Sequence, residues 1–213
     1  MPTAIEEFCQ ALIRNSGSFE IELSAADVYR LGQYYELLLK WNPRLHLVAP
    51  CTPTEFATRH VLESLLLLQH LSAAANIVDV GSGAGLPIIP CLIVRADLKA
   101  TMIESSPKKI VFLHEALRGI DLPERACLIT DRFENIRSPA ADFVTCRALD
   151  RFQEMLPRLI TWSPPGATLL IFAGEELKKQ IESGRPLSVI QRIPGSERRF
   201  LLMFTAEDPV TDS

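Results

Sequence analysis

The chain has 213 residues, a length that fits one large domain or one core with a smaller attachment. Hydrophobic residues make up 47% and charged residues 23%, which excludes a disordered chain and provides for a full-sized core. The formal net charge of −4 excludes a uniformly basic coat for a polyanion or a membrane surface. A polyanionic partner would therefore have to meet local basic groups, which occur within residues 30–60 and 185–199.

The five cysteines are scattered and form no CxxC pair, so the sequence predicts neither a metal site nor a disulfide framework. Cys91, Cys127 and Cys146 lie in apolar stretches and are expected to be buried. The first ten residues include two glutamates and lack the pattern of a secretory signal. Polar residues and prolines interrupt every apolar run before bilayer length. These features favour a cytoplasmic protein with no membrane partner.

The first 72 residues are expected to form helices. Ser24, followed three residues later by Asp27, resembles a capping box, and apolar residues then recur at helical spacing as far as Trp41. The pair Asn42-Pro43 is expected to end this helix, because proline disfavours helical backbone in the preceding residue. This segment is predicted to be a helical cap on the domain that follows.

A second helix is expected from about Thr54 to Leu71. Its polar residues Arg59 and Glu63, and likewise His60 and Ser64, are four residues apart and should share one helix face. Its apolar residues are expected to line another face; they include Val61, Leu65 and Leu68.

Residues 73–213 are predicted to form an α/β domain that packs with the helical cap into one compact unit. Short apolar runs alternate there with helical stretches, which indicates βαβ units and a doubly wound, mostly parallel sheet. The first five expected strands are Ile77–Val80, Ala100–Ile103, Cys127–Thr130, Asp142–Cys146 and Thr168–Phe172, and the clearest helices are Lys108–Arg118 and Phe152–Trp162.

The end of the chain departs from this alternation. Two apolar runs, Leu187–Ile193 and Arg199–Thr205, flank the turn Pro194-Gly195-Ser196 and predict a hairpin. The expected sheet therefore has seven strands, all parallel except for one antiparallel strand at the C-terminus.

The strongest chemical signal is the run V-D-V-G-S-G-A-G-L-P at residues 78–87. A buried strand delivers Asp79, and Gly81, Gly83 and Gly85 then let the backbone pass close to a ligand before a helix begins. Glu104 follows the next strand, where a carboxylate commonly accepts both hydroxyls of a ribose. The turn and the acidic residue together predict a nucleoside-containing ligand.

The spacing of the glycines favours one such ligand over another. The dinucleotide pattern G-x-G-x-x-G requires a glycine where this chain has Leu86, so the turn is not built for a pyrophosphate. S-adenosylmethionine (SAM) fits better than NAD, given Asp79 before the turn and the antiparallel hairpin at the end. A glycine turn with a purely structural role is the remaining alternative.

Several separate motifs resemble the bacterial small-subunit (16S) rRNA guanine-N7 methyltransferases, a family known as RsmG or GidB. The resemblance runs from Lys40 to about Phe204, and the order and spacing of its motifs are more specific than the glycine turn. The motifs are Lys40-Trp41-Asn42, Arg59-His60-Val61-Leu62-Glu63-Ser64, Asp79 to Pro87, Arg132-Phe133-Glu134 and Arg147-Ala148.

This resemblance implies a Rossmann-like class I SAM-dependent methyltransferase whose substrate is 16S rRNA or the small ribosomal subunit. It implies contacts to SAM at Gly81, Leu86, Phe133, Glu134 and Arg147, beside those expected from the turn and strand-end rules at Gly83, Gly85 and Glu104. The chain departs from the family pattern at His46, Val48, Glu63 and Ala173. These departures affect the expected RNA contacts more than the expected SAM site.

The implied reaction transfers a methyl group to N7 of an exposed guanine. Guanine N7 carries a lone pair and no proton, so no general base is expected, and orientation of the reactants supplies the rate. Arg147 is expected to position the reactants, through guanine O6 or the cofactor. The candidate RNA contacts are Asn42, Arg44, Arg59, His60, Glu63 and Ser64.

Three other functions remain open. A SAM-dependent methyltransferase for a small molecule or a protein is compatible with the acidic composition. A non-enzymatic ribosome assembly factor that binds SAM is compatible with the departures from the family pattern, and an NAD-dependent oxidoreductase is the least favoured. No long exposed apolar stripe calls for a dimer, so a monomer is expected.

Overall fold

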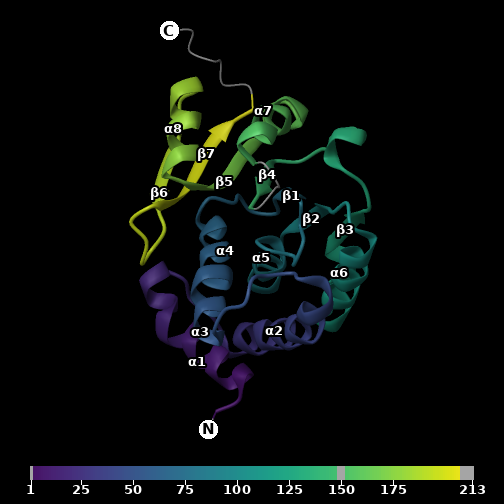
Figure 1. Cartoon of the computed structure of the whole chain (residues 1–213), viewed down its shortest axis with the longest axis vertical. Helices are drawn as coiled ribbons and strands as arrows, with labels where there is room; N and C mark the ends of the chain where they lie inside the picture. The colour runs from purple at the N-terminus through teal and green to yellow at the C-terminus, as the bar shows by residue number, and fades with distance from the viewer. Residues whose placement is uncertain (1, 148–151, 207–213) are drawn as a thin grey trace.

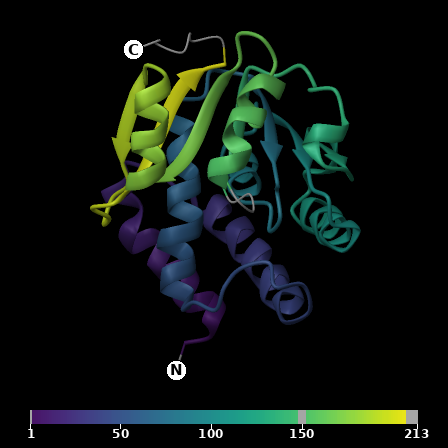
Figure 2. The ribbon, with the colours of Figure 1, turned by 45° about the horizontal axis from the view of Figure 1, so that its top comes forward.

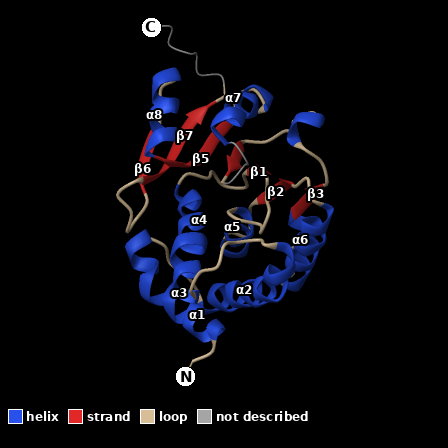
Figure 3. Cartoon of the chain, viewed as in Figure 1, coloured by secondary structure: helices blue, strands red, loops and turns tan. Residues whose placement is uncertain are grey.

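Seven strands form one sheet in the computed structural model, which describes residues 2–147 and 152–206. The strand order is β3-β2-β1-β4-β5-β7-β6, and β7 is antiparallel to both of its neighbours while the other pairs are parallel (Figures 1 and 3). The predicted mostly parallel sheet with one antiparallel strand is confirmed. The strands are β1 Asn76–Val80, β2 Lys99–Ile103, β3 Ala126–Ile129, β4 Phe143–Cys146, β5 Thr168–Gly174, β6 Val189–Arg192 and β7 Arg199–Thr205.

Helices cover both faces of the sheet because its strands are apolar on both sides. Helices α5, Ile88–Val94, and α6, Pro107–Gly119, belong to the apolar core of one face. Helices α7, Phe152–Trp162, and α8, Glu175–Gly184, belong to that of the other face (Figure 2). The polar α8 was not among the helices that the sequence predicted.

The N-terminal segment is helical, as predicted, and packs against α5 and α6. Its apolar side chains join the same core as those of α5 and α6, so the core is continuous across residue 72. The division into a helical cap, residues 1–72, and an α/β domain, residues 73–213, therefore stays a prediction about the functions of the two parts. The elements are α1 Ala4–Asn15, η1 Ser16–Phe19, α2 Ala25–Leu45, and a long stretch made of α3 Pro53–Glu55, η2 Phe56–Leu62, α4 Glu63–Leu65 and η3 Leu66–Gln69.

Three local predictions need correction. Helix α2 does not end at Asn42-Pro43: Pro43 lies within its last turn, where it removes a single backbone donor, and the helix closes at His46 in the left-handed region. The predicted second helix contains a π-helical turn, η2, rather than regular α-helix. Cys127 is exposed, because it lies on an edge strand, whereas Cys91 and Cys146 are buried.

Part of one sequence motif lies outside the described residues. Ala148, which follows Arg147 in the last of the family motifs, belongs to the segment 148–151. Among the residues that the structure describes, no helix combines the length and the apolar character needed to cross a membrane.

Candidate functional site

A cavity of about 470 Å³, here called the switch-point cavity, lies at the carboxyl ends of β1, β2 and β4. Strand order reverses between β1 and β4, and ligands of open α/β sheets bind at such a reversal. Its lining comes from the turns after β1 and β2, the loop after α2, and the side chains of His60 and Arg147. The fold thus joins the glycine motif to two motifs distant in sequence.

The turn after β1 forms the first wall of this cavity. All three of its glycines have positive φ, at 75°, 50° and 83° for Gly81, Gly83 and Gly85, which side chains disfavour. A Cβ atom at Gly85 would lie 2.3 Å from Cδ1 of Ile89. Gly81 and Gly83 line the cavity with Leu86, while Gly85 allows α5 to pack beneath the turn.

Glu104 lies at the edge of the same wall, as the strand-end rule predicts. Its carboxylate accepts hydrogen bonds from the backbone N–H groups of Gly83 and Ser106, at 2.9 and 2.7 Å. These bonds fix the carboxylate between the two turns while it lines the cavity. Each oxygen retains a second lone pair for a ligand hydroxyl.

Asp79 is the one residue near the turn whose buried side chain has no partner in the described structure. It is 1% exposed, and neither carboxylate oxygen accepts a hydrogen bond. Burial raises the pKa of this carboxyl to about 7. An unpartnered buried carboxylate costs free energy, and the raised pKa favours its neutral, protonated form; Asp79 itself does not line the cavity.

Side chains of helix α2 hold two segments of the cavity lining in place, a role that the sequence did not reveal. The hydroxyl of the fully buried Tyr34 donates to the backbone oxygen of Ala84 in the glycine turn, at 2.7 Å. Asn42 donates to and accepts from the backbone of Val48, at 3.1 and 3.0 Å, which fixes the loop that lines the cavity. A buried tyrosine needs a hydrogen-bond partner, but sequence periodicity does not show which one.

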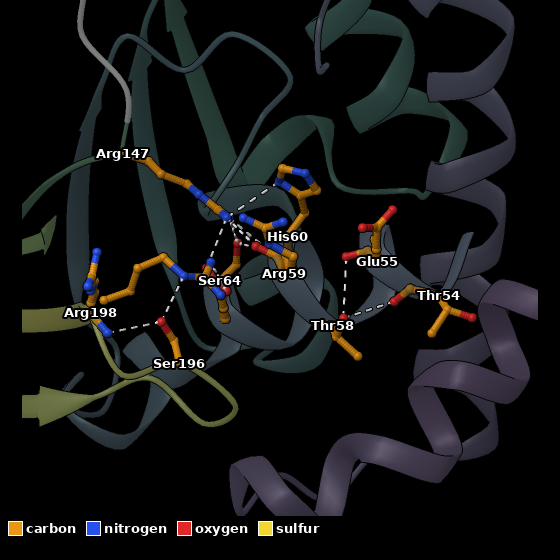
Figure 4. Close-up of polar contacts among 11 residues, drawn as sticks. Thr54, Glu55, Thr58, Arg59, His60, Ser64, Arg147, Ser196 and Arg198 are labelled. Carbon is orange, nitrogen blue, oxygen red and sulfur yellow. Dashed lines mark hydrogen bonds and ion pairs between the residues drawn. The ribbon is translucent and has the colours of Figure 1, made fainter. Parts of the chain in front are cut away.

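Arg147 forms the opposite wall, where β4 ends (Figure 4). One of its terminal nitrogens donates to the backbone oxygen of His60 and to Oγ of Ser64, both at 2.9 Å. The other donates to the backbone oxygen of Arg59 and lies 3.3 Å from the Glu63 carboxylate. The π-helical turn η2 turns these two backbone oxygens toward the guanidinium, and such turns often occur at functional sites.

Glu63 joins Arg147 to a second arginine. Its carboxylate is 3% exposed and pairs with Arg147 through one oxygen and with Arg199 through the other. Burial raises the pKa of this carboxyl, and the two guanidinium groups oppose that shift. Two cations against one buried anion favour the ionised carboxylate.

His60 lines the cavity beside Arg147. Nδ1 of His60 lies 3.4 Å from a terminal nitrogen of Arg147, and the imidazole packs on the Phe56 ring at 5.2 Å. Burial, together with the charges of Arg147 and Arg59, lowers the pKa of this imidazole to about 4. His60 is therefore neutral near pH 7, with Nδ1 facing a donor.

The predicted RNA contacts fall into two groups. Arg44 and Arg59 are exposed, and His60 faces the cavity, so these side chains are accessible to a substrate. Glu63 and Ser64 are buried and hold Arg147, and Asn42 holds Val48. The structure thus gives the second group positioning roles inside the protein.

Phe133 and Glu134 do not line the switch-point cavity. Phe133 is 3% exposed and packs edge-on against Trp162, with ring centroids 5.4 Å apart. Both residues border a different cavity, of about 460 Å³, beside α7. Their contact with SAM stays a prediction.

Lys109 in α6 also lines the switch-point cavity and was not predicted from the sequence. Its position follows from the packing of α6 beside β2. Within the described ranges, no group of three or more histidine, cysteine or acidic side chains is arranged to hold a metal ion.

Known structures share this fold. An RNA methyltransferase from Salinibacter ruber, solved with S-adenosyl-L-homocysteine, matches with a TM-score of 0.58 and 16% identity, over 78% of this chain and 98% of its own. A ribosomal protein L11 methylase from Lactobacillus delbrueckii subsp. bulgaricus matches with a TM-score of 0.55 and 12% identity, over 68% and 77% of the two chains. At these identities the likeness concerns the fold.

Sequence relatives are closer. The ribosomal RNA small subunit methyltransferase G of Anaeromyxobacter sp. (strain Fw109-5) is 33% identical over 171 residues, covering 79% of this chain and 80% of the relative. That of Xanthomonas axonopodis pv. citri is 39% identical over 153 residues, covering 71% of each chain. The family model described as GidB, rRNA small subunit methyltransferase G, matches residues 27–196. The family model and these relatives show that the chain belongs to the GidB family of rRNA small subunit methyltransferases, and its structure gathers the glycine turn, Arg147 and His60 around one cavity.

Proposed function

We propose that this chain transfers a methyl group from SAM to N7 of a guanine in 16S rRNA. Membership in the rRNA small subunit methyltransferase G family supports the reaction class and the RNA. The single observation that carries the proposal is the switch-point cavity, in which the glycine turn and Glu104 face Arg147 and His60.

The residues of this cavity fit SAM. Glu104 is fixed by two backbone donors and presents its remaining lone pairs for ribose hydroxyls. Asp79 does not line the cavity, but its buried carboxylate just before the turn has no hydrogen-bond partner and suits a positive charge nearby. When bound, SAM supplies a methyl group on a cationic sulfur.

The side chains around the cavity suit a nucleophile that carries no proton. His60 has a pKa of about 4 and its Nδ1 faces Arg147, which makes it a poor proton acceptor. Guanine N7 needs no such acceptor, since it attacks with a free lone pair. Arg147 is held by backbone oxygens and Glu63, so it acts by positioning the wall against which the base lies.

The RNA must present its guanine outside a regular duplex, because the deep groove of an A-form helix hides N7. Residues 1–72 serve as the RNA-side cover, with Arg44 and Arg59 exposed on it. The protein acts as a monomer in the cytoplasm.

Methyl transfer from labelled SAM tests this function. The acceptors are small ribosomal subunits that lack the modification and, separately, the naked rRNA extracted from them. Label recovered as 7-methylguanosine after nuclease digestion supports the proposal, and the better acceptor identifies the preferred form of the RNA. SAM binding without label in either RNA would instead favour an assembly factor or another substrate.

A charge-reversal variant tests the RNA-side cover. The double variant Arg44→Glu and Arg59→Glu should weaken binding to rRNA and leave SAM affinity unchanged, because both side chains are exposed and neither guanidinium lines the switch-point cavity. Unchanged RNA affinity would contradict the assignment of this surface.

A further inference from the structure

A second cavity, here called the hairpin cavity, has a volume of about 550 Å³. Three segments far apart in sequence form it: the end of α1 with η1, the turn η2, and the loop between β6 and β7, which lies near the N-terminal helices in Figure 1. Arg59 lines this cavity while its neighbour His60 lines the switch-point cavity. One helical turn thus separates the two cavities.

The hairpin cavity carries excess positive charge. Arg59 and Arg199 line it together with a single carboxylate, that of Glu63, which also neutralises Arg147. Within the described residues the exposed guanidinium of Arg59 forms no ion pair. Burial and the charges of Arg147, Arg59 and Arg199 lower the pKa of His60, which lines the neighbouring switch-point cavity.

Arg199 is held in a fixed orientation. One terminal nitrogen pairs with Glu63, and Nε donates to Oγ of Ser196 at 3.2 Å. The side chain is still 32% exposed, and its other terminal nitrogen has no partner among the described residues. A guanidinium that is oriented beforehand and keeps free donors binds an oxyanion with little loss of side-chain entropy.

We propose that the hairpin cavity binds a phosphate group of the RNA backbone, with Arg199 and Arg59 as its cationic anchors. This inference rests on the proposed rRNA substrate and adds a second contact site to it. An RNA chain whose base enters the switch-point cavity passes the intervening turn η2 and places a backbone phosphate in the hairpin cavity. Glu63 holds Arg147 and Arg199 in place on the two sides of that turn.

The test compares two neighbouring arginines of the full-length protein. Arg199→Gln removes the anchor, and Arg198→Gln removes the same charge from an exposed residue outside the cavity lining (Figure 4 shows Arg198). Binding to naked small-subunit rRNA is measured at several salt concentrations. Arg199→Gln should weaken binding roughly 10-fold and reduce the salt slope by about one. Arg198→Gln should have a much smaller effect.

Equal losses in the two variants, or no loss in Arg199→Gln, would overturn the proposal. Inorganic phosphate serves as the second probe: if it stabilises the wild type and not Arg199→Gln while rRNA binding is equal in both, the cavity binds free phosphate and the assignment to RNA fails. Because binding is measured without turnover, a failure of methyl transfer would remove the proposed reaction and leave this site intact.

A second pair of variants covers the case in which Arg199→Gln does not fold. Ser18 is exposed and lines the hairpin cavity, whereas Ser16 lies on the same turn outside the lining. Ser18→Glu should repel the phosphate and weaken rRNA binding, and Ser16→Glu should not. Equal binding by these two variants would contradict the proposal.

Discussion

The two walls of the switch-point cavity are built on different principles. The glycine wall is made largely by backbone whose positive φ angles only glycine adopts easily, and its ligand-facing groups come from two short turns, one after β1 and one after β2. The arginine wall is made by Arg147 just after β4, by Glu63 and Ser64 of α4 and by His60 with two backbone oxygens of η2, with Arg199 of β7 behind them. The first wall depends on local conformation and the second on a buried balance of charge.

The two sides of the cavity also differ in the pKa shifts of their buried titratable groups. Burial raises the pKa of Asp79 on the glycine side to about 7, while burial and neighbouring arginines lower the pKa of His60 on the arginine side to about 4. One cause, the loss of water, acts on an acid and on a base in opposite directions. Burial therefore favours the neutral forms of Asp79 and His60, whereas the ion pairs of Glu63 with Arg147 and Arg199 remain charged.

The largest expected effect comes from removing the centre of the arginine wall. Arg147→Ala removes one donor from each of the backbone oxygens of Arg59 and His60 and deprives Glu63 of one of its two partners. Loss of one member of a buried pair costs about 3–5 kcal/mol of unfolding free energy. Urea denaturation measures it, and a loss below about 1 kcal/mol would show that the arginine wall does not depend on this residue.

The glycine wall should respond to the addition of a single methyl group. Gly85→Ala should destabilise the protein by about 1–3 kcal/mol, because the new Cβ would lie 2.3 Å from Ile89 Cδ1 at a φ of 83°. Gly83→Ala is the matched control: its Cβ would meet only the Gly81 backbone oxygen, at 3.7 Å, so its cost should be near 1 kcal/mol. Equal costs from denaturant unfolding would remove the packing argument for Gly85.

The opposite pKa shifts predict opposite changes in the pH dependence of stability. Between pH 4 and 6.5 the unfolded His60 binds more protons than the folded one, so its contribution makes stability fall on acidification. Between pH 3.8 and 7 the folded Asp79 binds more protons than the unfolded one, so its contribution makes stability fall as pH rises.

Variants at these two residues separate the contributions. His60→Asn should lower, and Asp79→Asn should raise, the slope of unfolding free energy against pH in these windows, each by up to about 1.4 kcal/mol per pH unit. Denaturant unfolding at a series of pH values measures both slopes. Changes of the same sign in the two variants would contradict the contrast between the walls.

The smallest expected effect concerns the support of the glycine wall by α2. Tyr34→Phe removes the hydroxyl that donates to the Ala84 backbone oxygen and should cost about 0.5–1.5 kcal/mol of stability, with weaker SAM binding. Tyr35→Phe is the control, since Tyr35 is also buried but contributes ring stacking against Phe8 and Phe56. Calorimetric titration with SAM compares the two variants, and equal affinities would show that the Tyr34 hydroxyl does not contribute to SAM binding.

The cavity was only partly predictable. Gly81, Gly83 and Glu104 line it as the turn and strand-end rules predict, since the ends of parallel strands meet at one edge of the sheet, and Leu86 lines it as the family resemblance implies. The arginine wall was harder to predict from the sequence. Helix periodicity suggested that Glu63 and Ser64 belonged to a polar face, whereas both are buried against Arg147. The π-helical turn changes the spacing that such periodicity assumes.

The sequence by itself determined the order of strands and helices, the hairpin at the end and the conformation of the glycine turn. These features depend on hydrophobic period and on backbone preferences, which act over a few residues. The tertiary structure alone decided that Tyr34 supports the glycine turn, that Phe133 packs on Trp162, and that Glu63 links two arginines. Such contacts join residues far apart in the chain, and a buried polar group finds its partner only when the whole core has packed.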